Sequence, residues 1–193
     1  MKKEPNQRRD EIIEKAASLF QEQGYRAVSM RKLALHLDIK ASSLYNHINS
    51  KQEILSEIVM ELARDFTIHI QSVSRSLNKN AGEKMREIIE MHVRVTIRKT
   101  DFLACLNNDW MHLGEKDREE YIEMRQSYES DFRAILEEGI QQNQFVKMDK
   151  EIAVFSMLSS LRTFYLWLKR NPEQDEQHLI DEMNRNLLDG ILK

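Results

Sequence analysis

Polar side chains crowd the stretch from residue 42 to residue 47, which contains Ser42, Ser43, Tyr45, Asn46 and His47. Leu44 and Ile48 are its large apolar members. A helix with so polar a face is poorly suited to a protein core. Hydroxyl and amide groups can, however, hydrogen-bond to base edges and phosphate oxygens in a DNA groove. We therefore predict that a helix over about residues 41–47 lies in the major groove of DNA.

A second short helix is expected just before this one, over about residues 29–36, with a tight turn at residues 37–40. Its apolar face would consist of Met30, Leu33, Ala34 and Leu37. Two short helices joined in this way form a helix-turn-helix. We expect Ser42, Ser43, Tyr45 and Asn46 to contact bases and phosphates, while phosphates are anchored by Ser29, Arg31, His47 and Lys51.

The next helix should start with a capping box, in which Ser50 caps the backbone amide of Glu53 and the Glu53 side chain returns to Ser50. Free amides, the helix dipole and Lys51 would then attract a DNA phosphate. The same pattern also fits an ordinary well-capped helix with no ligand.

Charge is divided unevenly along the 193 residues. Residues 1–50 hold nine Lys and Arg against six Asp and Glu, a net charge of +3. Residues 51–193 hold twenty against twenty-six, a net charge of −6. The first part can neutralise phosphates while the rest favours solubility.

Composition favours an all-α protein, since Gly and Pro are scarce and strong helix formers dominate. No apolar run approaches the roughly 18 residues of a membrane span, and no signal peptide is evident. With the single Cys105, these features indicate a cytoplasmic protein. No membrane partner and no cofactor are indicated.

Apolar residues at helical spacing predict the remaining helices. These helices are expected over about residues 7–23, 51–77, 83–98, 101–113, 115–143, 149–170 and 176–192. A loose polar arm is expected over residues 1–6. We place a DNA-binding domain at residues 1–50 and a helical ligand-binding and dimerisation domain at residues 51–193.

The stretch from residue 29 to residue 51 resembles the helix-turn-helix of TetR-family transcriptional regulators. The features that carry the resemblance are Ser29, Arg31, Leu33-Ala34, Leu44-Tyr45 and Ser50-Lys51. Asp38 stands where the family usually has Gly in the turn, and Asp tolerates the left-handed conformation. Lys40 replaces the usual Ser or Thr cap of the recognition helix. The resemblance implies a three-helix DNA-binding unit, a palindromic double-stranded operator and a homodimer built from the last two long helices.

Those last two helices carry more apolar surface than one small bundle needs. Phe155, Leu158, Ser159 and Leu166 on one, and Met183, Leu187 and Ile191 on the other, would suit packing against a second copy. A dimer would place two recognition helices at the spacing that a palindromic site requires.

The middle helices are rich in Met, Tyr, Phe and Trp, which line adaptable apolar pockets but also fill ordinary cores. Our candidate effector-binding residues are Leu106, Trp110, Tyr121, Met124, Arg125, Tyr128 and Phe164. Some members of the family are released from DNA by acyl-CoA thioesters. The chain resembles them in the segment Asn108-Asp109-Trp110-Met111-His112-Leu113 and then in Arg118, Tyr121, Arg125, Tyr128, Phe132 and Gly139. We therefore expect an apolar or acyl-CoA-type effector, with a multidrug-type ligand as the alternative. Arginines such as Arg94, Arg98 and Arg133 could meet its phosphates or form surface ion pairs.

Other classes of protein compete with a repressor. A helical-bundle metalloenzyme is suggested by Asp109-x-x-His112 and Asp175-x-x-His178, although Asp175 also suits a helix cap. A hydrolase is disfavoured because Cys105 lies in an apolar helix and no nucleophile elbow occurs. A pure interaction module is disfavoured by the polar recognition helix. We therefore predict no enzymatic activity and no metal site.

Overall fold

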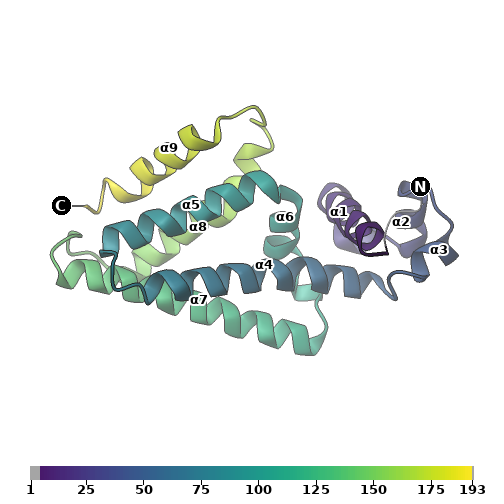
Figure 1. Cartoon of the computed structure of the whole chain (residues 1–193), viewed down its shortest axis with the longest axis horizontal. Helices are drawn as coiled ribbons and strands as arrows, with labels where there is room; N and C mark the ends of the chain where they lie inside the picture. Colours follow the sequence, from purple (N-terminus) through teal and green to yellow (C-terminus); the bar gives the residue numbers. More distant parts are fainter. Residues whose placement is uncertain (1–4, 193) are drawn as a thin grey trace. The chain divides into compact units, whose positions relative to one another are not determined.

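The computed structural model describes residues 5–192 and contains nine α-helices and two short 3-10 helices in that range (Figure 1). An isolated antiparallel bridge pairs Phe145 with Leu192. The prediction of an all-α protein is confirmed. In chain order the elements are α1 (Pro5–Gln23), η1 (Tyr25–Ala27), α2 (Met30–His36), α3 (Ala41–Tyr45), α4 (Lys51–Ser74), α5 (Ala81–Arg98), α6 (Thr100–Asn108), η2 (Trp110–His112), α7 (Glu115–Gln141), α8 (Lys150–Leu168) and α9 (Glu176–Leu188).

The described chain divides into two compact units. The first contains residues up to 63 together with residues 101–122, and the second contains residues 64–100 and those from 123 onward. Helices α4 and α7 contribute residues to both units. The functional boundary that we place between residues 50 and 51 stays a prediction.

The first unit has a small helical core. One face of α1 is buried, as its apolar spacing predicts, through Ile12, Ile13, Ala16, Ala17 and Phe20. Gly24 ends this helix with a φ of 83°, a left-handed conformation that glycine adopts without strain, and its amide donates to the Phe20 carbonyl. Tyr25 and Val28 are also buried, and the Tyr25 ring lies edge-on to Phe20 with 5.1 Å between the ring centroids.

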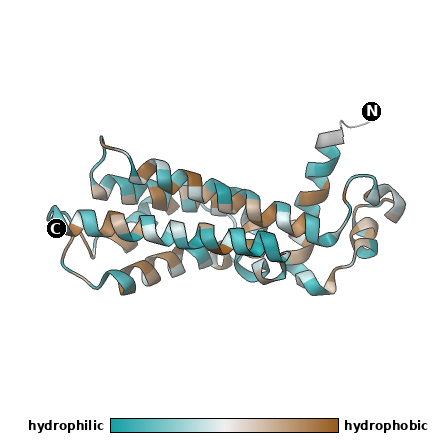
Figure 2. Cartoon of the chain, turned by 90° about the horizontal axis from the view of Figure 1, so that it is seen from below, coloured by the Kyte–Doolittle hydropathy of each residue, from teal (hydrophilic) through white to brown (hydrophobic). Residues whose placement is uncertain are grey.

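The second unit contains α5 packed against α8 and α9 (Figure 1). The buried face of α5 includes Met85, Ile88, Ile89 and Val93. Hydrophobic and hydrophilic residues alternate along the helices in Figure 2, as expected for helices with one buried side. The Lys84 side chain is also buried here, and its ammonium lies 2.8 Å from a Glu138 carboxylate oxygen.

Side-chain caps fix three helix starts in the second unit. Asn80 and Glu83 form a complete capping box, so α5 starts at Ala81, two residues before its predicted start. Asp149 and Asp175 cap α8 and α9 by accepting backbone amides. Asp175 is therefore a helix cap, which is the alternative that we gave to its being a metal ligand.

Several predicted boundaries were wrong. The helix predicted over residues 101–113 is interrupted at Asp109, whose φ of −116° and ψ of −3° end α6 and lead into η2. Helix α4 ends at Ser74 rather than Leu77. Helix α9 ends at Leu188 rather than Leu192, because Gly190 and Ile191 form a turn instead. Of the predicted polar arm, residues 1–4 lie outside the described residues, and α1 already begins at Pro5.

A close contact shapes the turn after α7. Gly139 lies so near the buried Phe145 ring that a Cβ atom there would be 2.1 Å from Cδ2 of Phe145. The Gly139 carbonyl also accepts the backbone amides of Gln144 and Phe145. Asn143, with a φ of 57°, reverses the chain between them. Glycine is thus required at position 139 for space.

Among the described residues, no helix is both long enough and apolar enough to cross a lipid bilayer.

Candidate functional site

The first unit holds the two helices of the predicted helix-turn-helix. Ser29 caps α2 by accepting the Lys32 backbone amide at 3.2 Å, and its hydroxyl keeps a proton to donate. Asp38 adopts the left-handed conformation expected of it, with a φ of 53°. The Ile39 amide donates to the Ala34 carbonyl at 3.0 Å, which closes the turn between α2 and α3.

Helix α3, the predicted recognition helix, presents a polar face. Leu44 is buried beneath it, and Ile48 is buried just after it. Ser42, Tyr45 and Asn46 are exposed, while Ser43 and His47 are half-buried. Arg31 on α2 is exposed as well. Seven of the eight predicted DNA-contacting residues therefore lie in or beside the two helices, and their contacts with bases or phosphates stay a prediction.

Lys51, the eighth, has partners within the protein. Its ammonium donates to the Tyr25 carbonyl at 2.7 Å and lies 4.1 Å from the centre of the Tyr25 ring. Burial lowers the pKa of Lys51, although the negative charge of Asp109 opposes this shift. The Tyr25 ring also stacks on His112, with 5.3 Å between the ring centroids. The phosphate contact of Lys51 stays a prediction, and sequence reasoning missed this cluster because its members are far apart in the chain.

The capping box at the start of α4 is half as predicted. The Ser50 hydroxyl accepts the Glu53 amide at 3.0 Å. The Glu53 carboxylate accepts the backbone amide of Asn49 at 2.8 Å, one residue before the expected donor, and also the Asn49 side chain at 2.9 Å. Burial raises the pKa of Glu53, but hydrogen bonds from Arg9 and Asn49 outweigh it and leave the pKa below its ordinary value.

The candidate effector residues fall into separate groups. In the first unit, Leu106 and Tyr121 are buried, and the rings of Trp110 and Tyr121 lie 5.5 Å apart. In the second unit, Met124 is half-buried and Tyr128 is buried. The structure thus brings two aromatic candidates together.

The second unit also contains a buried polar pair, which joins His92 on α5 to Tyr128 on α7. The Tyr128 hydroxyl lies 2.8 Å from Nε2 of His92, and Phe66 stacks on the His92 ring at 4.6 Å. Helical spacing puts His92 on the inner face of α5, but it does not identify Tyr128 as its partner.

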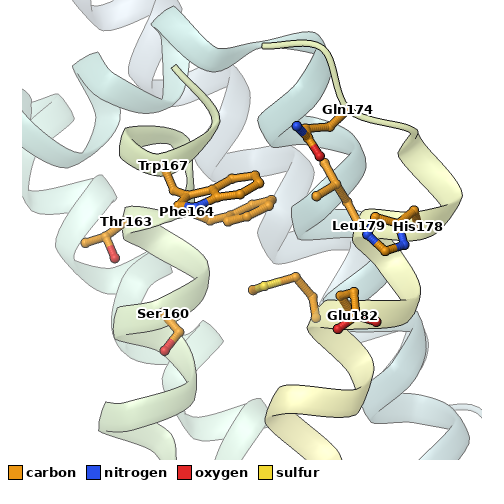
Figure 3. A pocket seen from close by; sticks show the side chains of 9 residues that line it. Ser160, Thr163, Phe164, Trp167, Gln174, His178, Leu179 and Glu182 are labelled. Atoms are coloured by element: carbon orange, nitrogen blue, oxygen red, sulfur yellow. The ribbon is translucent and has the colours of Figure 1, made fainter. Parts of the chain in front are cut away.

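Phe164 lines a different hollow, which lies between α8 and α9 and has a volume of about 490 Å³ (Figure 3). Its ring stacks on Trp167 at 5.7 Å between centroids. The close-up shows both rings on α8 and faced across the gap by His178, Leu179 and Glu182. The remaining lining residues are Ser160, Thr163, Gln174 and Met183.

Most of the arginines considered for an acyl-CoA phosphate are in ion pairs. Arg125 pairs with Glu129 at 3.2 Å, and the Glu129 carboxylate also pairs at 2.8 Å with Arg162, which was not among those candidates. Arg133 pairs with Glu151 at 2.5 Å. Arg94 pairs with Glu90 and Glu176, and Arg98 lies 3.7 Å from Glu176. These contacts match the ion-pair alternative for the arginines.

Other reactive groups offer little chemistry. Cys105 is buried, its Sγ lies 3.8 Å from the Ala17 carbonyl, and burial raises the pKa of its thiol. A thiol that stays protonated is a poor nucleophile. Within residues 5–192, no cluster of three or more His, Cys, Asp or Glu side chains could hold a metal ion.

Two family matches cover most of the chain. Residues 12–58 match "Bacterial regulatory proteins, tetR family", and residues 78–191 match "Tetracyclin repressor-like, C-terminal domain". The chain is 27% identical over 149 residues to the HTH-type transcriptional repressor KstR2 of Rhodococcus jostii, covering 76% of this chain and 72% of that protein. It is 23% identical to the uncharacterised HTH-type regulator YhgD of Bacillus subtilis, over 93% of this chain and 94% of that protein.

Solved structures share the fold. The ketosteroid transcriptional regulator KstR2 of Mycobacterium tuberculosis matches with a TM-score of 0.88 and 20% identity over 96% of this chain and 95% of that one. PfmR from Thermus thermophilus matches with a TM-score of 0.79 and 27% identity over 94% and 99%. AibR, in complex with isovaleryl coenzyme A and operator DNA, matches with a TM-score of 0.77 and 21% identity over 93% and 97%.

Proposed function

The chain belongs to the tetR family of bacterial regulatory proteins, a family of DNA-binding transcriptional regulators rather than enzymes, and we propose that it is a repressor released from a palindromic operator by a small apolar or acyl-CoA-type effector. The observation that carries the proposal is the exposed polar face of α3, with Tyr45 52% exposed above the buried Leu44. Hydroxyl, amide and imidazole groups on that face can read base edges in the major groove.

A homodimer is part of the proposal because α8 has an uncovered apolar face. Ile152, Phe155, Leu166 and Trp167 on this helix are exposed by 45% to 73%. Leu158, which the sequence pattern also assigns to the dimer face, is 1% exposed and packs inside its own chain. A second copy would cover the exposed residues and enter the hollow beside Phe164, and it would supply the two-fold symmetry that a palindromic operator needs.

The similarity to KstR2 supports the repressor role, and the effector class is supported by the coenzyme A thioester bound by AibR. The aromatic pair of Trp110 and Tyr121 is suited to an apolar group. We propose that binding shifts the population of conformations, repositions the helix that begins at Lys51 and so lowers operator affinity.

Fluorescence anisotropy on the DNA upstream of the protein's own gene tests this proposal, with and without a long-chain acyl-CoA. Tight binding that acyl-CoA abolishes is the expected result. Tight binding that is indifferent to acyl-CoA would keep the repressor and discard the effector class. A duplex of scrambled sequence is the control, and equal affinity for both duplexes, confirmed by selection from random sequences, would overturn the proposal.

A further inference from the structure

Arg9 on α1 joins three parts of the first unit. Its Nη1 donates to the His47 carbonyl at 2.5 Å. Its Nη2 donates to Oε1 of Glu53 at 2.8 Å and to Oε2 of Glu57 at 2.6 Å. The side chain is 31% exposed. Both terminal nitrogens of the guanidinium are thus directed into the protein.

The network continues into the link between the recognition helix and α4. While Oε1 of Glu53 accepts from Arg9, its Oε2 accepts the backbone amide and the side chain of Asn49. His47 and Asn49 both lie in the short segment between Tyr45, which ends α3, and Lys51, which starts α4. Arg9 therefore holds this segment at the His47 carbonyl, and Glu53 holds it at the backbone amide and the side chain of Asn49.

A basic residue near the start of a DNA-binding chain would ordinarily be assigned to a phosphate. The geometry of Arg9 favours a different role, because planar guanidinium forks lose little freedom when they hold two carboxylates and a carbonyl together. We propose that Arg9 is a positioning residue for operator recognition, which fixes the direction of α3 without contacting DNA. This inference rests on the proposed function.

Arg9→Gln and Arg9→Lys in the full-length protein test the inference. Arg8→Gln is the matched control, because Arg8 is the neighbouring arginine and pairs with Glu11 on its own helix at 2.6 Å. Anisotropy should be measured on operator and scrambled duplexes over a series of salt concentrations, at a temperature where circular dichroism shows each variant to be folded. The fraction of each protein that is able to bind DNA should be measured by titration at an operator concentration well above the dissociation constant.

We expect Arg9→Gln to weaken operator binding by about tenfold or more, because that is the change in affinity expected when one charge-assisted hydrogen bond is lost. Binding to the scrambled duplex should change much less, so the ratio of the two affinities falls. The dependence of log affinity on log salt should keep its slope. Arg9→Lys should restore only part of the loss, since one ammonium cannot reproduce the fork. Arg8→Gln should change both affinities by the same factor.

Three results would overturn the inference. A salt slope reduced by about 0.9 per protomer, with equal losses on both duplexes, would make Arg9 a phosphate contact. A loss of operator binding that is explained by a smaller fraction of binding-competent protein would show that Arg9 only stabilises the fold. Unchanged operator affinity in Arg9→Gln would leave it without a role in recognition. If instead the unaltered protein showed no preference for operator, the proposed function itself would fail, and this inference with it.

Discussion

Nε2 of His92 lies 2.8 Å from the hydroxyl oxygen of Tyr128, and both side chains are buried in the second unit. Burial lowers the pKa of His92 to about 3, and the positive charge of Arg162 acts in the same direction. The imidazole is therefore neutral in the folded protein near neutral pH. Burial likewise raises the pKa of Tyr128, so its hydroxyl stays protonated.

This pair makes stability depend on pH. The unfolded chain protonates His92 near its ordinary pKa of 6.5, and the folded chain does so only near 3. Between these values the unfolded state holds the extra proton, so stability falls as the pH is lowered from 6.5 toward 3, by up to about 1.4 kcal/mol per pH unit. His92→Gln keeps a polar partner for Tyr128. It should remove the contribution of His92 to the change of unfolding free energy with pH, as measured by urea denaturation between about pH 4.5 and 7.

Tyr128→Phe is the matched control for His92→Gln. It should lower the free energy of unfolding by about 1–3 kcal/mol, because it removes the hydrogen bond of the buried His92 imidazole, and it should leave the dependence of that free energy on pH unchanged. A full slope retained in His92→Gln would assign the acid sensitivity to other groups, such as the half-buried His69, whose pKa is also lowered by burial.

Gly139→Ala should destabilise the second unit. The new methyl group would occupy space held by the Phe145 ring, which is 1% exposed and cannot move aside freely. Overpacking of this kind costs about 1–3 kcal/mol. Thermal or urea unfolding measures the change, with Gly190→Ala as the control because no atom lies within 4 Å of its Cβ position. Phe145→Leu should relieve part of the loss, and an unaltered midpoint in Gly139→Ala would contradict the close packing.

Phe155→Asp should break the proposed dimer without unfolding the chain. Phe155 is 73% exposed on α8, so one protomer loses little when it is replaced. In a dimer the carboxylate would be buried without a partner, at a cost of about 3 kcal/mol or more. Sedimentation velocity over a range of concentrations should show a shift to monomer. Leu77→Asp, at a position 98% exposed after α4, should leave the dimer intact, and a dimer that survives Phe155→Asp would place the interface elsewhere.

The helices were predictable because their signals are local. Apolar spacing predicted α1 and α4, whose apolar faces are buried, and Asp38 adopts the left-handed backbone that its place in the turn of the resembling family led us to expect. Helix ends were less predictable where a backbone conformation decides them. Nothing in its residue type showed that Asp109 would interrupt a helix.

The candidate site was predictable only where it lies within one short stretch. Tyr45 and Asn46 are exposed beside Leu44 because all three share a single turn of helix. The contacts of Arg9 join residues 38, 44 and 48 positions apart, and no pattern in one sequence specifies such pairs. Phe164 was grouped with Trp110 by residue type, whereas the structure assigns it to the hollow between α8 and α9.

Tyr45→Ala should weaken operator binding while the fold is kept. The side chain is 52% exposed and lies on the polar face of α3, so its removal leaves no cavity in the core. A contact to a base or phosphate is worth about 1–3 kcal/mol per half-site. Anisotropy on the operator measures the loss, and circular dichroism checks the fold.

Ile68→Ala, at an exposed position on α4 in the second unit, is the control for Tyr45→Ala and should bind operator as the unaltered protein does. Tyr45→Phe separates the hydroxyl from the ring, since recovery with Phe would indicate an apolar contact, such as one with a thymine methyl group. Full affinity in Tyr45→Ala would remove this residue from the DNA interface.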